Sequence, residues 1–287
     1  MIMKEHITDI EKVIEYIESH LDSKLDLEKV AEASHYSKYH LYRIFADTVG
    51  LTIHDYVQRR QLTEAAKLLV FSDKPIIEVA FICGYESQQS FSTAFKSMYK
   101  MPPFEYREKR EFYPLQLRIT LSQKTPQKAF SKSDISLAGY DDINDWMNLM
   151  CLVIDGYPVM KEKDYLNEIM KCIDEQRALV LKDGDVLIGA MAFSYDSGSI
   201  EFLGIHPQYR KSGIHRLFIE VLIEKYLLGR EISMTTFREG DKADTGYRKE
   251  LKQLGFAERE LLTEFGYPTQ RFAYLPEEKE ETKCLEK

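Results

Sequence analysis

The first part of the sequence contains the same pattern twice, about 50 residues apart. The first copy has Val30, Ala31, Tyr36, Leu41, Phe45 and Tyr56, and the second has Val79, Ala80, Tyr85, Phe91, Phe95 and Tyr106. Each copy predicts a short helix (27–33 or 76–82), a tight turn and a second helix, which is helix-turn-helix spacing. A chain with two such copies is expected to fold into two equivalent helical units.

Apolar residues recur at helical spacing through residues 5–110, which predicts an all-α region. Two segments show it: Ile10, Val13, Ile14 and Ile17, and Leu62, Ala65, Ala66 and Leu69. Ser37 and Ser87 precede the second helix of each copy as expected caps. Pro75 stands at a helix start, where its missing N–H has no helical partner to lose. The helix through 59–69 then joins the copies and sets their separation.

The second helix of each copy is expected to expose side chains that can read bases. If Leu41, Ile44 and Phe45 face the core, then Tyr39, Tyr42 and Arg43 point outward. In copy two, packing of Phe91, Ala94 and Phe95 leaves Gln89, Ser90, Thr93 and Lys96 outside. Arg and Gln can make bidentate contacts with bases. For one helix alone, a solvated face that binds nothing explains these exposed residues equally well. The presence of two such units joined by a stiff helix favours DNA binding.

Net charge does not decide whether the chain binds nucleic acid. The chain has 39 basic and 47 acidic residues, a net charge of -8. However, residues 1–36 hold 4 basic and 9 acidic side chains, whereas residues 37–110 hold 11 and 8. Binding depends on which face the cations occupy. The acidic average therefore does not exclude a DNA partner.

Residues 5–110 resemble the AraC/XylS family of bacterial transcription regulators, and more closely its stress-response subgroup. The matching segments are YSKYHLYRIF (36–45), RQLTEAA (60–66), GYESQQSFSTAFK (84–96) and PPFEYR (102–107). The resemblance implies that two recognition helices enter successive major grooves of double-stranded DNA. Tyr39, Tyr42 and Arg43 would read one half-site, and Gln88, Gln89 and Ser90 the other. Two recognition helices in one chain permit binding as a monomer.

Two positions in the second copy depart from that family pattern. Thr93 stands where the subgroup often has an arginine, so contacts in the second half-site are expected to differ. Lys100 stands where the wider family has a glycine, which the first copy keeps as Gly50. A non-glycine residue there has to adopt an unfavourable turn conformation.

The remaining sequence predicts a second domain of mixed α/β type. A chain of 287 residues favours two domains. Residues 111–134 lose the helical period and are expected to be a linker. Short β-prone runs follow at 186–193, 199–205 and 232–237, with a helix at 214–228 between the last two. The second domain would span 135–276, and residues 277–287 form a charged tail expected to fray.

The cysteines and the apolar runs point to a cytoplasmic chain. The four cysteines (Cys83, Cys151, Cys172 and Cys284) form no CxxC pair, which favours neither a disulfide framework nor a metal site. The sequence has no run of about 20 apolar residues, as a membrane span requires. We therefore expect a protein of the reducing cytoplasm with no membrane partner.

The loop after the 199–205 strand predicts a phosphate site. Arg210 and Gly213 precede a mostly apolar helix, and the N–H groups at a helix N-terminus attract anions. A glycine between strand and helix is also common for turn geometry alone. The order of elements from Val186 to Phe256 resembles the GNAT acetyltransferase fold, with a central mixed sheet. That resemblance implies that backbone N–H groups of Arg210, Lys211, Ser212, Gly213, Ile214 and His215 bind the pyrophosphate of acetyl-CoA.

The same resemblance implies that the strand through Leu203 and Ile205 pairs with the pantetheine arm. His215 departs from the small residue usual in the family and is expected to crowd the phosphates. Transfer of acetyl to an amine needs a base and an acid. Glu201 is the candidate base, although it can equally be a structural carboxylate. Leu251 replaces the family's usual tyrosine acid, so Tyr247, one turn earlier, is the substitute candidate; otherwise it is core. Trp146 is expected in the core.

Three hypotheses follow. In the first, the protein is a sequence-specific DNA-binding regulator whose GNAT-like domain binds acetyl-CoA and acetylates an unknown amine, without a metal. In the second, that domain senses a ligand without turnover, which His215 and Leu251 favour. In the third, the chain is an acetyltransferase that uses its helices only to dock on a partner.

Overall fold

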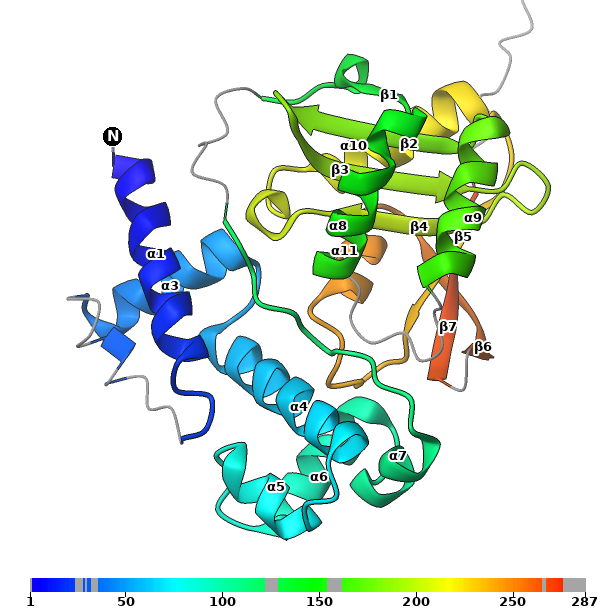
Figure 1. Ribbon diagram of the computed structural model, residues 1–287. Coiled ribbons are helices and arrows are strands. Elements are labelled where there is room, and N and C mark those ends of the chain that lie inside the picture. Colours follow the sequence, from blue (N-terminus) through cyan, green and yellow to red (C-terminus); the bar gives the residue numbers. More distant parts are fainter. Residues whose placement is uncertain are drawn as a thin grey trace, which may run out of the picture.

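The N-terminal half of the chain consists of helices (Figure 1). The computed structural model describes residues 2–23, 28, 30–31, 36–121, 129–153, 162–264 and 267–275. The helices are α1 (Ile2–Glu18), α3 (Lys38–Val49), α4 (Ile53–Phe71), α5 (Ile76–Ile82), α6 (Gln88–Tyr99) and α7 (Pro103–Lys109). The predicted 27–33 helix lies largely outside the described residues, as does the charged tail 277–287.

Two separate cores flank α4, one for each copy of the duplicated pattern. Phe45 and Tyr56 are fully buried in the first core, between α1, α3 and the start of α4. In the second, Phe95 stacks on Tyr99 and both meet Tyr106 edge to face, with ring centroids 4.4–5.3 Å apart. Burial of aromatic rings of this size dominates the stability of each unit. The predicted duplication is therefore confirmed as two packed helical units.

The ends of the two recognition helices follow most of the predictions. Gly50 and Lys100 end α3 and α6 in the left-handed region, with φ 77° and 61°. The unfavourable conformation predicted for Lys100 is thus confirmed. Ser87 accepts a hydrogen bond from Ser90 N, as a cap should. Ser37 is the N-cap residue of α3 in the extended cap conformation, as predicted, but its hydroxyl accepts no bond from α3. Because Ser37 is exposed, water can satisfy that first turn.

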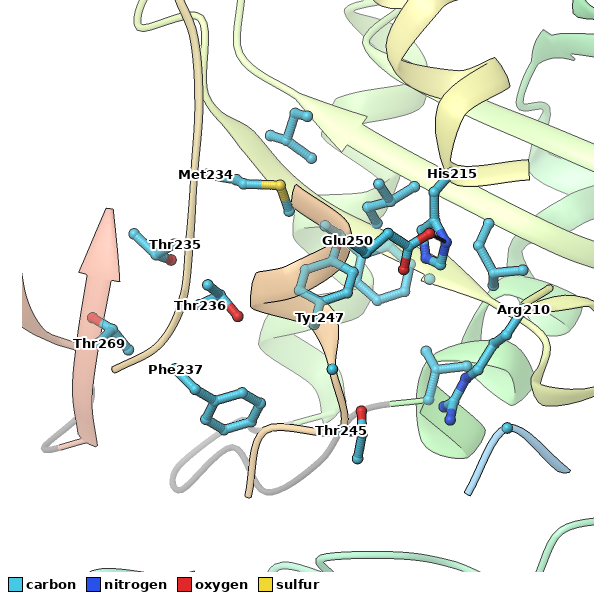
Figure 2. A pocket seen from close by; sticks show the side chains of 18 of the residues that line it. Arg210, His215, Met234, Thr235, Thr236, Phe237, Thr245, Tyr247, Glu250 and Thr269 are labelled. Carbon is cyan, nitrogen blue, oxygen red and sulfur yellow. Dashed lines mark ion pairs between the residues drawn. The ribbon is translucent and has the colours of Figure 1, made fainter. Parts of the chain in front are cut away.

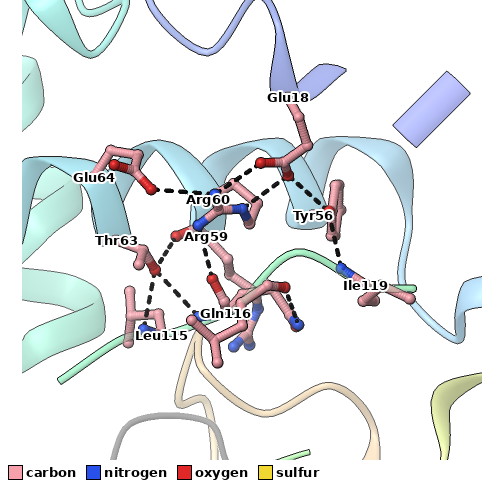
Figure 3. Close-up of polar contacts among 10 residues, drawn as sticks. Glu18, Tyr56, Arg59, Arg60, Thr63, Glu64, Leu115, Gln116 and Ile119 are labelled. Carbon is pink, nitrogen blue, oxygen red and sulfur yellow. Dashed lines mark hydrogen bonds and ion pairs between the residues drawn. The ribbon is translucent and has the colours of Figure 1, made fainter. Parts of the chain in front are cut away.

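The predicted linker begins as an extended segment along α4, which Figure 1 shows in green. Its apolar side chains are buried in the helical cores: Tyr113, Leu115, Ile119 and Leu121. Thr63 of α4 accepts hydrogen bonds from the backbone N–H groups of Leu115 and Gln116, at 3.0 and 3.1 Å. Figure 3 shows how this segment joins a buried polar network around Arg60. The segment is thus part of the helical half and not a loose spacer.

The C-terminal half contains two antiparallel sheets. The first has the order β1-β2-β3-β4 and the second the order β5-β7-β6. Their strands are β1 (Ile135–Leu137), β2 (Ala178–Asp183), β3 (Val186–Phe193), β4 (Ile200–Ile205), β5 (Ile232–Phe237), β6 (Ala257–Glu264) and β7 (Tyr267–Tyr274). The helices are α8 (Ile143–Val153), α9 (Glu162–Asp174), α10 (Ile214–Val221) and α11 (Tyr247–Gln253). A π-helical turn, Leu222–Tyr226, continues α10.

Helices cover both faces of the first sheet. Ala178 and Val180 of β2 pack with α8 and α9, whereas Leu179 and Leu181 pack on the side of α10. This alternation follows from the two-residue period of a strand. Trp146 of α8 is fully buried against Phe202, which confirms its predicted place in the core.

The two sheets differ from the single mixed sheet expected from the sequence. Within the described residues, one parallel bridge, Ser199 to Ser233, joins them. Beyond this bridge β4 and β5 pair with β3 and β7 and not with each other. The facing edges of the parallel strands β4 and β5 are therefore unpaired with each other beyond the bridge, and an opening lies between them.

Polar contacts between described residues join the two halves. Arg59, 2% exposed, donates to Ala243 O at 2.6 Å. Lys100 Nζ lies 2.7 Å from Asp241 Oδ1. Lys211 Nζ lies 2.5 Å from Asp47 Oδ1. None of the helices that the structure describes is both long and apolar enough to cross a bilayer.

Candidate functional site

The predicted outward faces of α3 and α6 are exposed. Tyr39 is 80% exposed and Arg43 is exposed, while Tyr42 is half-buried. On α6 the exposed set comprises Gln88, Gln89, Ser90, Thr93 and Lys96. The residues predicted to turn inward are buried or half-buried: Leu41, Ile44, Phe45, Phe91, Ala94 and Phe95. The orientation inferred from the helical period is confirmed except at Tyr42, and α4 contributes residues to the cores behind both helices.

The side chains on these exposed faces differ in how readily they can reach a ligand. The hydroxyls of Ser90 and Thr93 already donate to the backbone of their own turn, to Ser87 O and Gln89 O, both at 2.9 Å. They would exchange these bonds to contact a base. Arg43 and Gln89 carry longer exposed side chains with several N–H donors. Direct recognition is therefore expected from the long side chains first.

A pocket of about 390 Å³ lies between the diverging edges of β4 and β5 (Figure 2). One wall residue, Gly50, comes from the helical half. The α/β half contributes the others: Val153, the β4 residues 200–205, the loop residues Arg210 and Lys211, His215, the β5 residues 234–237, residues 245–247 with Glu250, and Glu264, Tyr267 and Thr269. The lining mixes apolar strand residues such as Leu203 and Ile205 with charged and hydroxyl-bearing side chains.

The predicted phosphate loop lies at one end of this pocket. Arg210, Lys211 and His215 line it, as do the strand residues Leu203 and Ile205. Ser212 and Gly213 are exposed and are not among the lining residues, and the Ile214 side chain is fully buried in the core. The backbone N–H groups of Arg210 and Ser212, predicted to bind phosphate, already donate to Pro207 O and Tyr209 O, at 3.3 and 3.0 Å. The loop can thus offer mainly the backbone N–H groups at the start of α10, which have no helical partner.

This end of the pocket also touches the first helical unit. Arg210 Cδ lies 2.8 Å from the position that a Cβ on Gly50 would take, and Lys211 pairs with Asp47 of α3. Gly50 therefore serves two purposes: it allows the left-handed cap of α3 and leaves room for Arg210. The sequence suggested only the first of these.

The candidate base Glu201 lines the pocket but is already engaged. Its Oε2 accepts a hydrogen bond from Arg177 at 2.6 Å. Arg177 is 7% exposed in its side chain and also holds Glu168 and Glu175, at 2.6 and 2.5 Å. One guanidinium thus binds three carboxylates. This arrangement favours the structural interpretation of Glu201 over that of a base poised to accept a proton.

Tyr247 and His215 come together on the opposite wall. Their rings meet edge to face, with centroids 5.7 Å apart. Figure 2 shows the Glu250 carboxylate pointing toward His215. Its Oε1 lies 2.7 Å from Nδ1 of the buried imidazole, although outside regular hydrogen-bond geometry. The sequence identified His215 as a departure from the family but did not identify Glu250. Leu251, the residue in place of the family's tyrosine, is buried in the core.

Comparisons with known proteins cover the helical half best. A family described as a helix-turn-helix domain matches residues 30–109. The chain is 40% identical over 112 residues to the multiple antibiotic resistance protein MarA of Escherichia coli (strain K12), which covers 37% of this chain and 88% of MarA. It is 41% identical over 98 residues to the uncharacterized HTH-type transcriptional regulator YbfP of Bacillus subtilis (strain 168). That match covers 34% of this chain and 33% of YbfP.

The α/β half is similar to a solved structure at a lower level. A GNAT family acetyltransferase from Bacillus cereus matches with a TM-score of 0.40 and 16% identity, covering 49% of this chain and 95% of that one. A score at this level does not by itself establish a shared fold.

Proposed function

Since this chain belongs to the AraC family of DNA-binding transcriptional regulators, we propose that α3 and α6 read two successive major grooves of one DNA site. We further propose that the α/β half binds acetyl-CoA between β4 and β5 and acetylates an amine. The observation that supports DNA reading is the pair of exposed faces held by α4. Each face contributes at least one long donor side chain, Arg43 on α3 and Gln89 on α6.

Replacement of Arg43 by alanine tests the DNA proposal. We expect affinity for a site selected from random DNA to fall by about 1–3 kcal/mol, with relaxed base preference at one position. Gel-shift titration or fluorescence anisotropy on a panel of single-base variants measures both effects. Arg216→Ala is the matched control because Arg216 is an exposed arginine of α10.

Other outcomes would change this assignment. Equal weakening on every sequence would mean that Arg43 contacts only phosphate. Absence of DNA binding by the wild-type chain would contradict the proposal and favour helices that dock on a protein partner.

The acetyl-CoA proposal is supported by the divergence of β4 from β5. Backbone N–H and C=O groups along such facing edges can pair with an extended, amide-bearing arm, as they do with a strand. Arg210 and Lys211, with the N-terminus of α10, lie at one end of the opening, where an anion is favoured. A ligand with a pyrophosphate at one end and an amide-containing arm fits both features.

The reaction forms an amide bond between the amine nitrogen and the acetyl carbon and breaks the bond from that carbon to sulfur. The amine must first lose a proton, and the departing thiolate must gain one. Tyr247 has its side chain on the pocket wall and remains the candidate acid. Glu201 also lines the pocket and is the candidate base, with Oε2 occupied by Arg177.

The hydrogen bond from Arg177 to Glu201 favours a second candidate function, a sensor that binds acyl-CoA without turnover. Calorimetry with acetyl-CoA and with CoA tests binding, and release of CoA in the presence of an amine panel tests turnover. Binding with amine-dependent release that is lost in Glu201→Gln supports the enzyme. Binding without release on any amine supports the sensor, and absence of binding to either molecule contradicts both.

A further inference from the structure

A loop of the α/β half lies beside the base-reading face of α6. Two surface hollows border that face, and Lys242 lines both. In each hollow it is accompanied by Gln89 and Thr93, two of the exposed α6 residues assigned to base contacts. Lys242 itself is exposed. A cation from the second half of the chain therefore stands next to a recognition helix of the first.

Contacts with the helical half hold this loop in place. Asp241, whose side chain is 5% exposed, binds Lys100 at 2.7 Å. Its carboxylate also accepts from Ala243 N at 2.8 Å and from the Tyr267 hydroxyl at 3.1 Å. Arg59 of α4 binds Ala243 O at 2.6 Å. The residues on both sides of Lys242 are thus tied to α4 and to the end of α6.

These contacts also account for Lys100, the departure from glycine at the end of α6. Its side chain reaches Asp241 and lies over the Tyr267 ring, 5.4 Å from the centroid. A glycine would adopt the left-handed conformation with less strain but could not make either contact. The strain at Lys100 is therefore balanced by contacts that position the loop.

The dimensions of DNA indicate what Lys242 would meet. The major groove is roughly 12 Å wide, and a helix with its side chains is about 10–12 Å across. A recognition helix therefore fills the groove, and the sugar-phosphate strands lie directly beside it. A lysine at the flank of α6, on the same exposed side as Gln89, would lie at a phosphate strand.

We propose that Lys242 contacts a DNA phosphate beside α6, so that the α/β half forms a third part of the DNA-binding surface. This inference rests on the proposed reading of DNA by α3 and α6. It does not depend on acetyl-CoA. A phosphate contact carries no base information, and its role is to add affinity and fix orientation.

The test compares Lys242→Ala with wild type in the full-length chain, by fluorescence anisotropy on the selected site and on random DNA at several salt concentrations. Each phosphate neutralised contributes about 0.9 to the slope of log affinity against log salt. We expect the slope to fall by about 0.9 and the affinity to fall about three- to tenfold at 0.1 M salt, equally on both DNAs. Lys171→Ala, at an exposed lysine of α9, removes the same charge and should leave the slope unchanged.

Each other result overturns the inference. Unchanged slope and affinity in Lys242→Ala would show that the loop stays clear of DNA. Tighter binding would show that it obstructs α6. A loss confined to the selected site would mean a base contact instead. In all three cases the wild-type chain still binds DNA, which separates failure of this inference from failure of the proposed function.

Discussion

Replacement of Arg60 by alanine is expected to lower the free energy of unfolding by about 3–5 kcal/mol, the usual cost of removing one partner of a buried ion pair. Arg60 is 8% exposed in its side chain, and its Nε and Nη2 reach the two oxygens of Glu18 at 2.8 and 2.7 Å. Its Nη1 donates to Gln116 O at 3.1 Å. Without the guanidinium, a nearly buried carboxylate and a buried carbonyl would lose their partner (Figure 3).

Tyr56 cannot take over the role of Arg60. Burial and the nearby charge of Glu18 raise the pKa of Tyr56 well above its usual range, so it remains a neutral hydroxyl. That hydroxyl already donates to Glu18 Oε1 at 2.7 Å. One neutral donor would therefore be left to support a carboxylate charge in a poorly hydrated site.

Urea denaturation followed by circular dichroism measures this loss. Glu64→Gln is the control, because Glu64 is 38% exposed and its replacement leaves both bonds from Arg60 to Glu18 in place. The double variant Glu18→Leu/Arg60→Leu should recover part of the loss, since no uncompensated charge remains. A loss below 1 kcal/mol in Arg60→Ala would contradict the importance of this network.

Acidification from pH 6.5 to pH 4 is expected to destabilise the α/β half through protonation of His206. The shift of its pKa corresponds to a loss of about 3 kcal/mol in the free energy of unfolding. Burial, with the positive charge of Arg210 as the second cause, lowers the pKa of His206 to about 4. The unfolded chain, with an ordinary histidine pKa of about 6.5, then binds the proton more readily. Stability from this group is therefore complete above pH 6.5 and is lost as the pH falls toward 4.

The geometry at the end of β4 supports the neutral form. His206 is 8% exposed, and its Nδ1 accepts a hydrogen bond from Gln208 N at 3.3 Å. A protonated Nδ1 could not accept that bond. Protonation would thus disturb the segment that leads from β4 into the loop at Arg210.

The measurement is the urea midpoint at several pH values for wild type and for His206→Asn, whose side-chain oxygen can also accept a bond from Gln208 N. Other groups titrate alike in both chains. The stability of the variant should therefore fall less than that of the wild type between pH 6.5 and pH 4, by the contribution of His206. Identical pH profiles for the two chains would show that His206 is not the group responsible.

The helical half could largely be predicted from local patterns. The spacing of Leu41, Phe45 and their counterparts places the core of each unit, and the same spacing turns Tyr39 and Arg43 outward. These predictions hold because a helix couples residues three and four positions apart. Ser37 shows the limit, since an exposed first turn can be satisfied by water without a side-chain cap.

The candidate pocket was predictable only in part. The strand at 200–205 and the loop at 210–215 were identified from residue order and turn chemistry. The engagement of Glu201 by Arg177 was not, and neither was the approach of Glu250 to His215. Both pairs join elements whose relative positions depend on side-chain packing across the sheet. Leu251 marked a departure from the GNAT family pattern, but the sequence did not indicate which residue of that helix faces the pocket instead.

What the sequence determined by itself is the duplicated helical unit and the set of residues exposed on its two reading helices, because both follow from periodicity within one or two turns. Only the tertiary structure decided how the two halves meet. Arg59 binds Ala243, 184 positions away, and Lys100 binds Asp241, 141 positions away. Local propensity carries no information about such pairs, since they form only when separately folded cores dock and bury the groups between them.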